Sequence, residues 1–316
     1  MFEIFIGAKY RFMGRRKIAY LISGTLMLAS AISLIAHGGP KESIDFTGGN
    51  LLYVEFDRAV PVGEVREAVR AARMESAEVQ MAQENTQAIL RFRAAPGDQT
   101  NYFSAFQGEI QKRAGNPAVT LLSLETVGPK IGKELEQKAG LAILWSLILI
   151  LGYVAWRFKR ISFGLGAVIA LFHDVFITLG VFSVLGLEVD LTVVAALLTI
   201  GGYSINDTIV VFDRIRENMG LLKRMSFSDL IDKSVNQTLS RTILTSGVTL
   251  LTVVALFFLG GVVIHHFALA ILIGFVIGTY SSIFVASSLG LDFANWWIRR
   301  KTAKAHQAPA KAAATP

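Results

Sequence analysis

Six long apolar stretches constrain this chain more than any other feature of its sequence. Crossing the hydrocarbon core of a bilayer as a helix takes roughly 20 predominantly apolar residues. The stretches lie at residues 18–36, 137–156, 161–186, 190–212, 242–263 and 267–298. Only 17% of the 316 residues are charged, whereas soluble domains carry about 25%. The sequence therefore predicts a membrane-embedded all-α bundle of six transmembrane helices with a soluble part attached.

The first stretch follows three basic residues, Arg15, Arg16 and Lys17. A positive flank before an apolar run is typical of a signal peptide, whose apolar region is only about 7–15 residues long. The run at 18–36 is longer, which favours a retained anchor, with residues 1–36 as a cytoplasmic N-terminus and first transmembrane helix. A cleaved signal remains the alternative.

Residues 37–136 predict a separate domain between the first and second helices. Strand-like runs lie at 50–56, 77–83, 86–93 and 118–127, and helix-like runs at 62–73 and 98–114. Their order is β-α-β-β-α-β, which predicts an α+β domain with the ferredoxin-like arrangement. Acidic residues slightly outnumber basic ones in this region. It therefore offers no basic groove for nucleic acid.

The basic residues predict how the chain is threaded through the membrane. They gather at 1–17, 157–160, 214–241 and 299–316, whereas the links 185–190 and 259–266 carry no Lys or Arg. Cytoplasmic loops carry an excess of Lys and Arg. Both termini are therefore expected in the cytoplasm and the 37–136 domain outside it. The net charge of +7 then reflects topology rather than a nucleic-acid partner.

Two basic segments have further expectations attached. The segment 214–240, within the helical region 137–298, has apolar residues near helical spacing and predicts an amphipathic helix on the cytoplasmic membrane surface; a polar loop is the alternative. The tail 299–316 is rich in Ala, Lys and Pro and predicts disorder. That tail either contacts anionic headgroups or has no specific role.

Several kinds of chemistry are excluded by what the sequence lacks. The chain has no cysteine, which removes disulfides, thiol catalysis and cysteine metal sites. It contains no His-Glu-x-x-His, Gly-x-Ser-x-Gly or Walker motif, so it has no visible means of using ATP. We expect no enzyme activity, no metal site and no cofactor.

Ionisable residues nevertheless occur inside the apolar stretches. His173 and Asp174 lie in the middle of the third, Asp207 follows Asn206 in the fourth, and Arg241 opens the fifth. A charge at the bilayer centre costs on the order of 2.5–3.5 kcal/mol, and such residues are commonly functional. Nearby polar residues that could orient a carboxylate or hold water are Tyr203, Ser204, Thr208, Thr242 and Thr245. In the sixth stretch, Gly274, Gly278 and Ser282 share one helix face, which predicts close helix packing.

These residues leave several interpretations open. An ion-coupled transporter or motor needs a titratable carboxylate in its bundle. The same groups would also fit a buried ion pair that fixes helix register, with His173 a satisfied core residue. An intramembrane aspartyl protease would use Asp174 and Asp207, but the Gly-x-Gly-Asp signature is missing, since residues 203–206 read YSIN. A passive scaffold needs no ionisable core group.

Three motifs resemble those of a known family. They are SIDFTGG at 43–49, which contains Asp45, Phe46, Gly48 and Gly49, LFHDV at 171–175, and ALLTIGGYSINDTIVVFDRIREN at 196–218. Together they resemble the SecF family, the smaller half of the bacterial SecDF protein-export component in the resistance-nodulation-division superfamily. The resemblance covers nearly the whole chain in motif order, span count and the large first external loop.

The resemblance implies a proton-driven role in the bacterial cytoplasmic membrane. It implies a heterodimer with SecD that acts on unfolded polypeptides leaving the SecYEG channel after SecA, together with small accessory membrane proteins. Asp207 and Arg241 match the family's proton-coupling Asp and Arg, and SecD supplies a further Asp. The transmembrane proton gradient would be the energy source, although Na⁺ stays open. A proton-coupled exporter of lipids or small molecules is the alternative within the superfamily.

Overall fold

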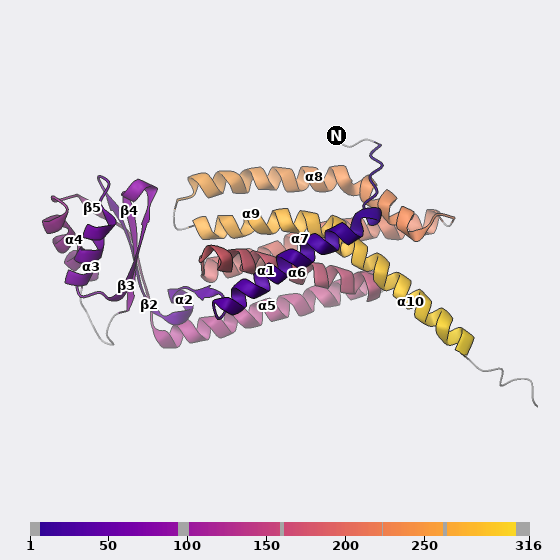
Figure 1. The fold of residues 1–316 in the computed structure, drawn as a ribbon, viewed down its shortest axis with the longest axis horizontal. Helices are drawn as coiled ribbons and strands as arrows, with labels where there is room; N and C mark the ends of the chain where they lie inside the picture. The colour runs from indigo at the N-terminus through magenta and orange to yellow at the C-terminus, as the bar shows by residue number, and fades with distance from the viewer. Residues whose placement is uncertain (1–6, 94–100, 159–160, 223, 262–263, 308–316) are drawn as a thin grey trace, which may run out of the picture. The chain divides into compact units, whose positions relative to one another are not determined.

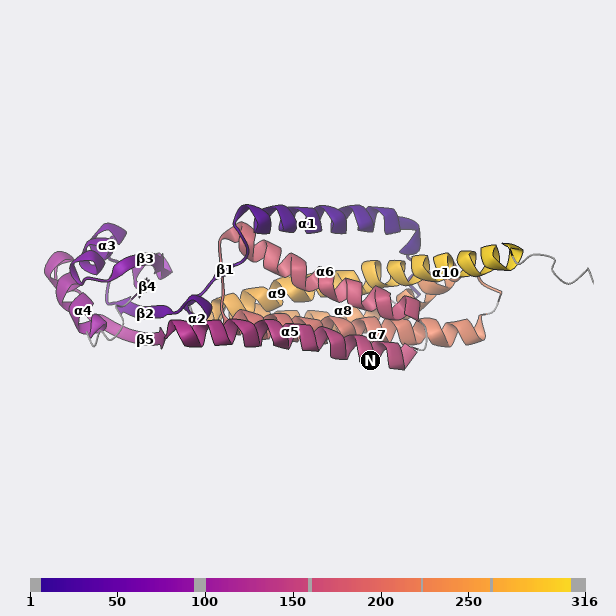
Figure 2. The same ribbon diagram turned by 90° about the horizontal axis from the view of Figure 1, so that it is seen from below.

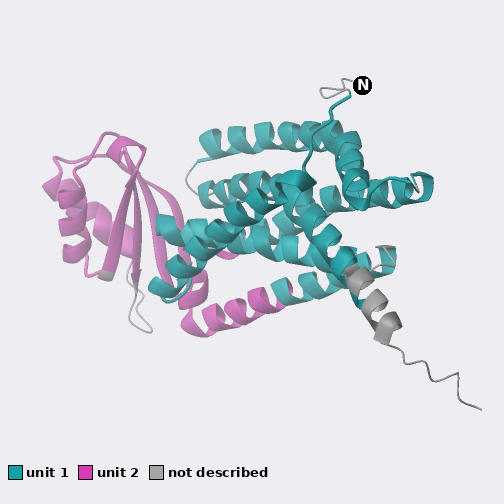
Figure 3. Ribbon diagram, turned by 45° about the vertical axis from the view of Figure 1, so that its right-hand side comes forward, with its two compact units in different colours: residues 1–41, 143–187, 192–316 teal, residues 42–142, 188–191 magenta. Residues whose placement is uncertain are grey.

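The computed structural model describes residues 7–93, 101–158, 161–222, 224–261 and 264–307. The chain divides into two compact units, which are described separately (Figure 3). The helix unit comprises 1–41, 143–187 and 192–316, and the sheet unit comprises 42–142 and 188–191. The short segment 188–191 thus belongs with a sheet that is distant from it in the sequence.

Six helical spans are long and apolar enough to cross a membrane among the described residues, as expected. They are formed by α1 (Arg16–Ala36), α5 (Pro129–Phe158), α6 (Ile161–Leu185), α7 (Leu191–Leu221), α8 (Phe227–Leu259), and α9 (His265–Tyr280) with its continuation. In the helix unit, α1 packs against α6 and α8 against α9 (Figures 1 and 2). The chain is a multi-pass membrane protein.

The expected surface helix at 214–240 is wrong as a separate element. Helix α7 continues to Leu221 and α8 begins at Phe227, so this stretch consists of the ends of two long helices joined by a short connection. Ser226 caps α8 by accepting a hydrogen bond from the Asp229 amide. The apolar residues Leu230, Ile231 and Val235 are buried in the helix core, which explains their helical spacing without a membrane surface.

The last span continues beyond α9 without a break. A π-helical segment, η3 (Ser281–Ala286), follows α9 and leads directly into α10 (Ser287–Gln307). The tail expected to be disordered from residue 299 is therefore helical as far as Gln307, because α10 runs on without a break. The rest of the expected tail, 308–316, lies outside the described residues.

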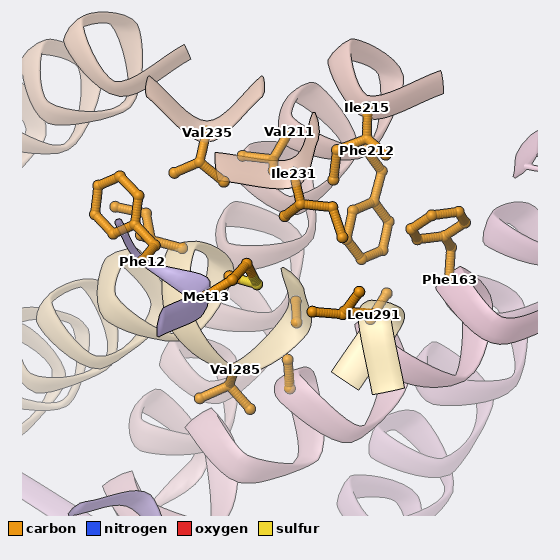
Figure 4. Packing of buried hydrophobic residues seen from close by; sticks show 14 of the residues in the cluster. Phe12, Met13, Phe163, Val211, Phe212, Ile215, Ile231, Val235, Val285 and Leu291 are labelled. Atoms are coloured by element: carbon orange, nitrogen blue, oxygen red, sulfur yellow. The ribbon is translucent and has the colours of Figure 1, made fainter. Parts of the chain in front are cut away.

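The N-terminal segment is part of the helix core. A short 3-10 turn, η1 (Met13–Arg15), precedes α1, and Phe12 and Met13 point into the cluster that includes Ile231 and Val235 (Figure 4). The Met13 side chain is 0% exposed, and its amide donates to Asp232 Oδ1 at 2.8 Å. Residues before the first helix are thus held by α8.

The sheet unit is built on four antiparallel strands in the order β3-β4-β2-β5. In chain order its elements are β2 (Gly49–Phe56), α3 (Val62–Ala71), β3 (Glu75–Ala82), β4 (Gln87–Arg93), α4 (Tyr102–Arg113) and β5 (Val119–Val127). Alternate residues such as Leu52, Val54 and Leu90 are buried in its core with the helix residues Val65 and Phe106. The β3–β4 connection is tight, because Gln83, Glu84 and Asn85 all have positive φ.

Three short elements of the sheet unit were not anticipated. They are β1 (Lys41–Glu42), α2 (Ile44–Thr47) and β6 (Glu188–Val189), with β1 and β6 forming a second, two-stranded sheet. Elements of two to four residues have no periodic pattern to reveal them. Their pairing brings the segment after α1 to the residues just before α7.

Candidate functional site

The first buried carboxylate of the helix unit, Asp174 on α6, is fully satisfied. Its side chain is 0% exposed, and His173 Nδ1 lies 2.9 Å from its Oδ1. Its Oδ2 accepts hydrogen bonds from Ser204 Oγ at 2.6 Å and Ser281 Oγ at 2.7 Å. Asp174 therefore connects α6, α7 and η3 through one carboxylate.

Small residues on α9 let the helices come close enough for these contacts. A methyl group on Gly274 would lie 2.2 Å from Ile200 Cδ1, and one on Gly278 would lie 3.2 Å from Ser204 Cβ. Ser282 adds hydrogen bonds with Thr208 Oγ1 at 3.1 Å and the Ser204 carbonyl oxygen at 3.3 Å. The close packing predicted for this face is confirmed, and it is directed against α7.

The second buried carboxylate, Asp207 on α7, is poorly satisfied by comparison. The residue is 5% exposed, and the hydrogen bond that its carboxylate accepts from Ser246 Oγ on α8 is long, at 3.4 Å. Thr279 Oγ1 donates in turn to Ser246 Oγ at 2.9 Å. No other hydrogen bond or ion pair of Asp207 occurs among the described residues.

Arg241 does not open a helix, as the sequence suggested, because α8 already begins at Phe227. Its side chain is exposed and lines an open pocket of about 670 Å³ between the ends of α7 and α8. The other lining residues are Val210, Asp213, Arg214, Arg216, Glu217, Gln237 and Thr238. The positive charge of Arg241 acts on Asp207, but within the described ranges no ion pair within 4.0 Å joins the two.

The remaining acidic and basic groups of this pocket are mostly paired. Asp213 bonds to Arg157 at 2.5 Å and to Arg216 at 3.3 Å. Arg214 bonds to Glu217 at 2.6 Å. Among the described residues, Arg241 is thus the arginine of the pocket wall that forms no ion pair with a carboxylate.

The other predicted polar residues divide into buried and exposed groups. Thr208 is buried against Ser282, while Thr242 Oγ1 and His173 Nε2 are buried without a hydrogen-bond partner among the described residues. Tyr203 stacks on Phe275 at 4.0 Å between ring centroids and its hydroxyl lies 3.4 Å from Thr249 Oγ1.

Asn206 and Thr245 lie on the exposed side of the helix unit. Thr245 Oγ1 is bonded to the Arg241 carbonyl oxygen at 2.9 Å within its own helix. Being adjacent to Asp207, Asn206 points away from it, as consecutive helix residues must. These two polar side chains are presented to whatever surrounds the unit.

Sequence reasoning missed Thr279 and Ser281, which complete the two carboxylate contacts. The signal was available, because residues 278–282 read GTYSS and form a polar cluster inside an apolar stretch. The orientation of Ser281 was not available, since a π-helical segment begins at this residue and departs from ordinary helical spacing.

The motif residues Asp45, Phe46, Gly48 and Gly49 lie in the sheet unit. Asp45 accepts a hydrogen bond from the Leu191 amide at 2.8 Å, and Phe46 is buried. Gly48 and Gly49 have φ values of 74° and 142°, a backbone region that favours glycine. No cluster of three or more His, Asp or Glu side chains suited to a metal occurs in the described part of the chain.

The fold and these buried groups define a class: multi-pass membrane proteins with ionisable side chains inside the helix bundle and a sheet unit attached to it. The family model "Protein export membrane protein SecD/SecF, C-terminal" matches residues 107–296, and "SecD/SecF GG Motif" matches residues 33–60. The chain is 46% identical to the protein translocase subunit SecF of Vibrio alginolyticus, over 92% of both chains. It belongs to the SecF family.

Longer relatives contain a counterpart of this chain as one part. The protein translocase subunit SecDF of Thermus thermophilus is 42% identical over 96% of this chain, which spans 40% of that protein. The crystal structure of SecDF from this bacterium matches with a TM-score of 0.82 at 40% identity, over 92% of this chain and 39% of that one. A super-membrane-facing form of SecDF matches with a TM-score of 0.70.

Proposed function

We propose that this chain works with a SecD-like subunit in polypeptide translocation across the bacterial cytoplasmic membrane, driven by the proton gradient through Asp207 and Arg241. Family membership supports the translocation role, since its relatives are named protein translocase subunits. The coupling rests on one observation, the unequal satisfaction of the two buried carboxylates.

Asp207 is suited to gaining and losing a proton, whereas Asp174 is suited to staying in one state. Two short serine hydrogen bonds and His173 hold Asp174, so a change of protonation there would disrupt a network joining three elements. Asp207 accepts one long hydrogen bond. Little is lost when its charge disappears, and we assign His173 and Asp174 an orienting role.

Arg241 supplies a positive charge whose distance from Asp207 changes with helix position. When it approaches Asp207, Coulombic attraction favours the ionised carboxylate; when it withdraws, the apolar surroundings favour the protonated one. The open pocket lined by Arg241 and Val210 lies about one helical turn from Asp207, because Val210 follows it by three positions. Protons would reach Asp207 from solution through this pocket.

A partner bundle would complete the site. Thr199, Gly202 and Asn206 form an exposed polar and small-residue face on α7, and Arg241 and Thr245 are exposed on α8. Polar groups facing lipid are costly and usually face protein or a water-filled cavity. SecDF of Thermus thermophilus contains a SecF-like part as about two fifths of its length, so we assign this face to SecD.

Topology and domain architecture follow from the same proposal. We infer that both termini are cytoplasmic and that the sheet unit is external, because the basic segments gather at the opposite ends of the helices. The element order β2-α3-β3-β4-α4-β5 and the strand order β3-β4-β2-β5 support a ferredoxin-like assignment. This unit would engage polypeptide leaving the SecYEG channel after SecA has pushed it in, with small accessory membrane proteins in the same complex.

The protease alternative is disfavoured by the carboxylate contacts. Aspartic proteases hold two carboxylates about 3 Å apart with one shared proton. Asp174 is bonded to Ser204 and Ser281, Asp207 is bonded to Ser246, and the two share no hydrogen-bond partner among the described residues.

The test is export in inverted membrane vesicles that contain the full complex. We expect Asp207→Asn and Arg241→Met to assemble normally, lose the gradient-dependent part of export and retain the ATP-driven part. Asp57→Asn, the same change at an exposed position of the sheet unit, is the matched control. Full gradient-dependent export by Asp207→Asn at normal assembly would make this carboxylate structural. Repeating the assay with a sodium gradient in place of the proton gradient identifies the coupling ion.

A further inference from the structure

The motif segment 43–49 holds the beginning of α7. Asp45 Oδ2 accepts a hydrogen bond from the amide of Leu191, the first residue of α7, at 2.8 Å. The Ser43 amide donates to the Val189 carbonyl oxygen at 3.0 Å. First-turn amides of a helix have no partner inside the helix, and here a distant carboxylate provides one.

The same segment also contacts the beginning of α5. A methyl group on Gly48 would lie 2.9 Å from Pro129 Cα, and one on Gly132 would lie 2.5 Å from the Phe46 carbonyl oxygen. The backbone of 46–48 therefore lies against the first turn of α5, where only glycine fits. One short segment thus fixes the first turns of two membrane-spanning helices.

An ion pair joins the four-stranded sheet to the same place. Arg91 on β4 pairs with Glu188 on β6 and with Glu78 at 3.2 Å. Glu188 is only 7% exposed. Removing either partner of a nearly buried ion pair destabilises the structure, because the other charge is left buried and unpaired. The sheet, the motif segment and the residues ahead of α7 therefore form one connected body within the sheet unit.

We infer that the 43–49 segment and the Arg91–Glu188 pair are a junction that transmits movement of the sheet unit to Asp207 through α7. Helix α7 is unbroken from Leu191 to Leu221, and Asp207 lies about 24 Å along it from Leu191 at 1.5 Å per residue. Rotation or tilt imposed at Leu191 would move Asp207 relative to Arg241. Asp45 and Arg91 are positioning residues in this scheme, which rests on the proposed function.

Hydrogen exchange tests the junction without reference to protons or export. In the full complex, Asp45→Ala should speed exchange of the first-turn amides of α7 about fivefold, the typical effect of losing a helix cap. Exchange in β2 and β4 should stay unchanged, which shows that the sheet unit remains folded. Asp45→Asn keeps an acceptor oxygen and should preserve the protection. Unchanged α7 exchange in Asp45→Ala would overturn the junction.

Export then tests transmission. Gradient-dependent export should fall about fivefold or more in Asp45→Ala, the lower range of coupling between distant sites, and recover in Asp45→Asn, with ATP-driven export intact. The single reversals Arg91→Glu and Glu188→Arg should reduce it as well, and the double reversal should restore it. Full gradient-dependent export in Asp45→Ala overturns this inference if Asp207→Asn still loses it. If Asp207→Asn also keeps it, the proposed function fails instead.

Discussion

The carboxylates of Asp174 on α6 and Asp207 on α7 are similarly buried but differ in the groups that surround them. Asp174 and Asp207 are both nearly inaccessible, yet one accepts two short serine hydrogen bonds beside a histidine and the other accepts one long bond. Fully satisfied buried polar groups make a structure rigid, whereas poorly satisfied ones carry an energetic cost. The number of contacts therefore predicts different roles for the two carboxylates.

Removing the Asp174 carboxylate should destabilise the protein more than removing that of Asp207. Asp174→Ala leaves Ser204, Ser281 and His173 without their shared acceptor and leaves a cavity, so we expect a loss of about 3 kcal/mol in the free energy of unfolding. Asp207→Ala should cost about 1 kcal/mol, because one weak hydrogen bond is lost. Unfolding in detergent, followed by circular dichroism, measures both. Equal losses would contradict the distinction.

The pKa of Tyr53 on β2 should depend on the charged residues around it in the sheet unit. Burial, then Glu125 and other carboxylates, raise its pKa to about 12, with Arg91 opposing them. The unfolded chain loses this phenolic proton near pH 10, so stability from this group should fall as pH rises from about 10 to about 12. The difference in ultraviolet titration between wild type and Tyr53→Phe isolates it. Glu188→Gln should lower the midpoint; no change would contradict the assignment.

The sequence revealed which residues are special but not how they pair. Asp174, Asp207 and Arg241 stand out because charge is costly in an apolar stretch. The partner of Asp174 was not visible, since Ser281 is an ordinary serine until α9 packs beside α6. Arg241 was expected to open the fifth span, but α8 already begins at Phe227, because the polar turns of a helix beyond a membrane lack the apolar run that marks a span.

At the scale of elements, the packing of α9 on α7 depends on Gly274, because glycine has no side chain to keep the helices apart. Gly274→Ala would place a methyl group 2.2 Å from Ile200 Cδ1, and overpacking of this kind costs about 1–3 kcal/mol. Ile200→Ala in the same chain should recover most of that loss. Gly247→Ala on α8, where no heavy atom lies within 4 Å, is the matched control and should be neutral or stabilising. A Gly274→Ala protein as stable as wild type would contradict this packing.

Long, continuous elements were predicted well from the sequence, and short or interrupted elements were predicted poorly. All six spans follow from the length of their apolar stretches, and the four strands of the main sheet follow from strand-like runs. The helix ends at Leu221 and Phe227 were missed, because nearby apolar residues such as Leu222 and Leu230 pack against the helix core. The short strands β1 and β6 depend on contacts between residues far apart in sequence, which periodicity does not report.

For the whole molecule, single cysteines should reveal the topology. The natural chain has no cysteine, so Ser104→Cys on the exposed side of α4 and Arg224→Cys between α7 and α8 each carry one reactive thiol. We expect an impermeant thiol reagent to label Ser104→Cys in cells with a permeabilised outer envelope and intact cytoplasmic membrane. Arg224→Cys should be labelled only after lysis. The reverse pattern would invert the proposed orientation.

The buried N-terminal segment has a consequence for biosynthesis. Phe12 and Met13 pack with Val235 and Leu291, and Asn236 bonds to both the amide and the carbonyl group of Tyr10. These contacts join residues that leave the ribosome more than 200 positions apart. At about 5–20 residues per second, the segment waits roughly ten seconds or more for α8 and α10. This part of the fold therefore forms late, and the segment stays accessible to insertion factors and proteases until α8 and α10 have been made.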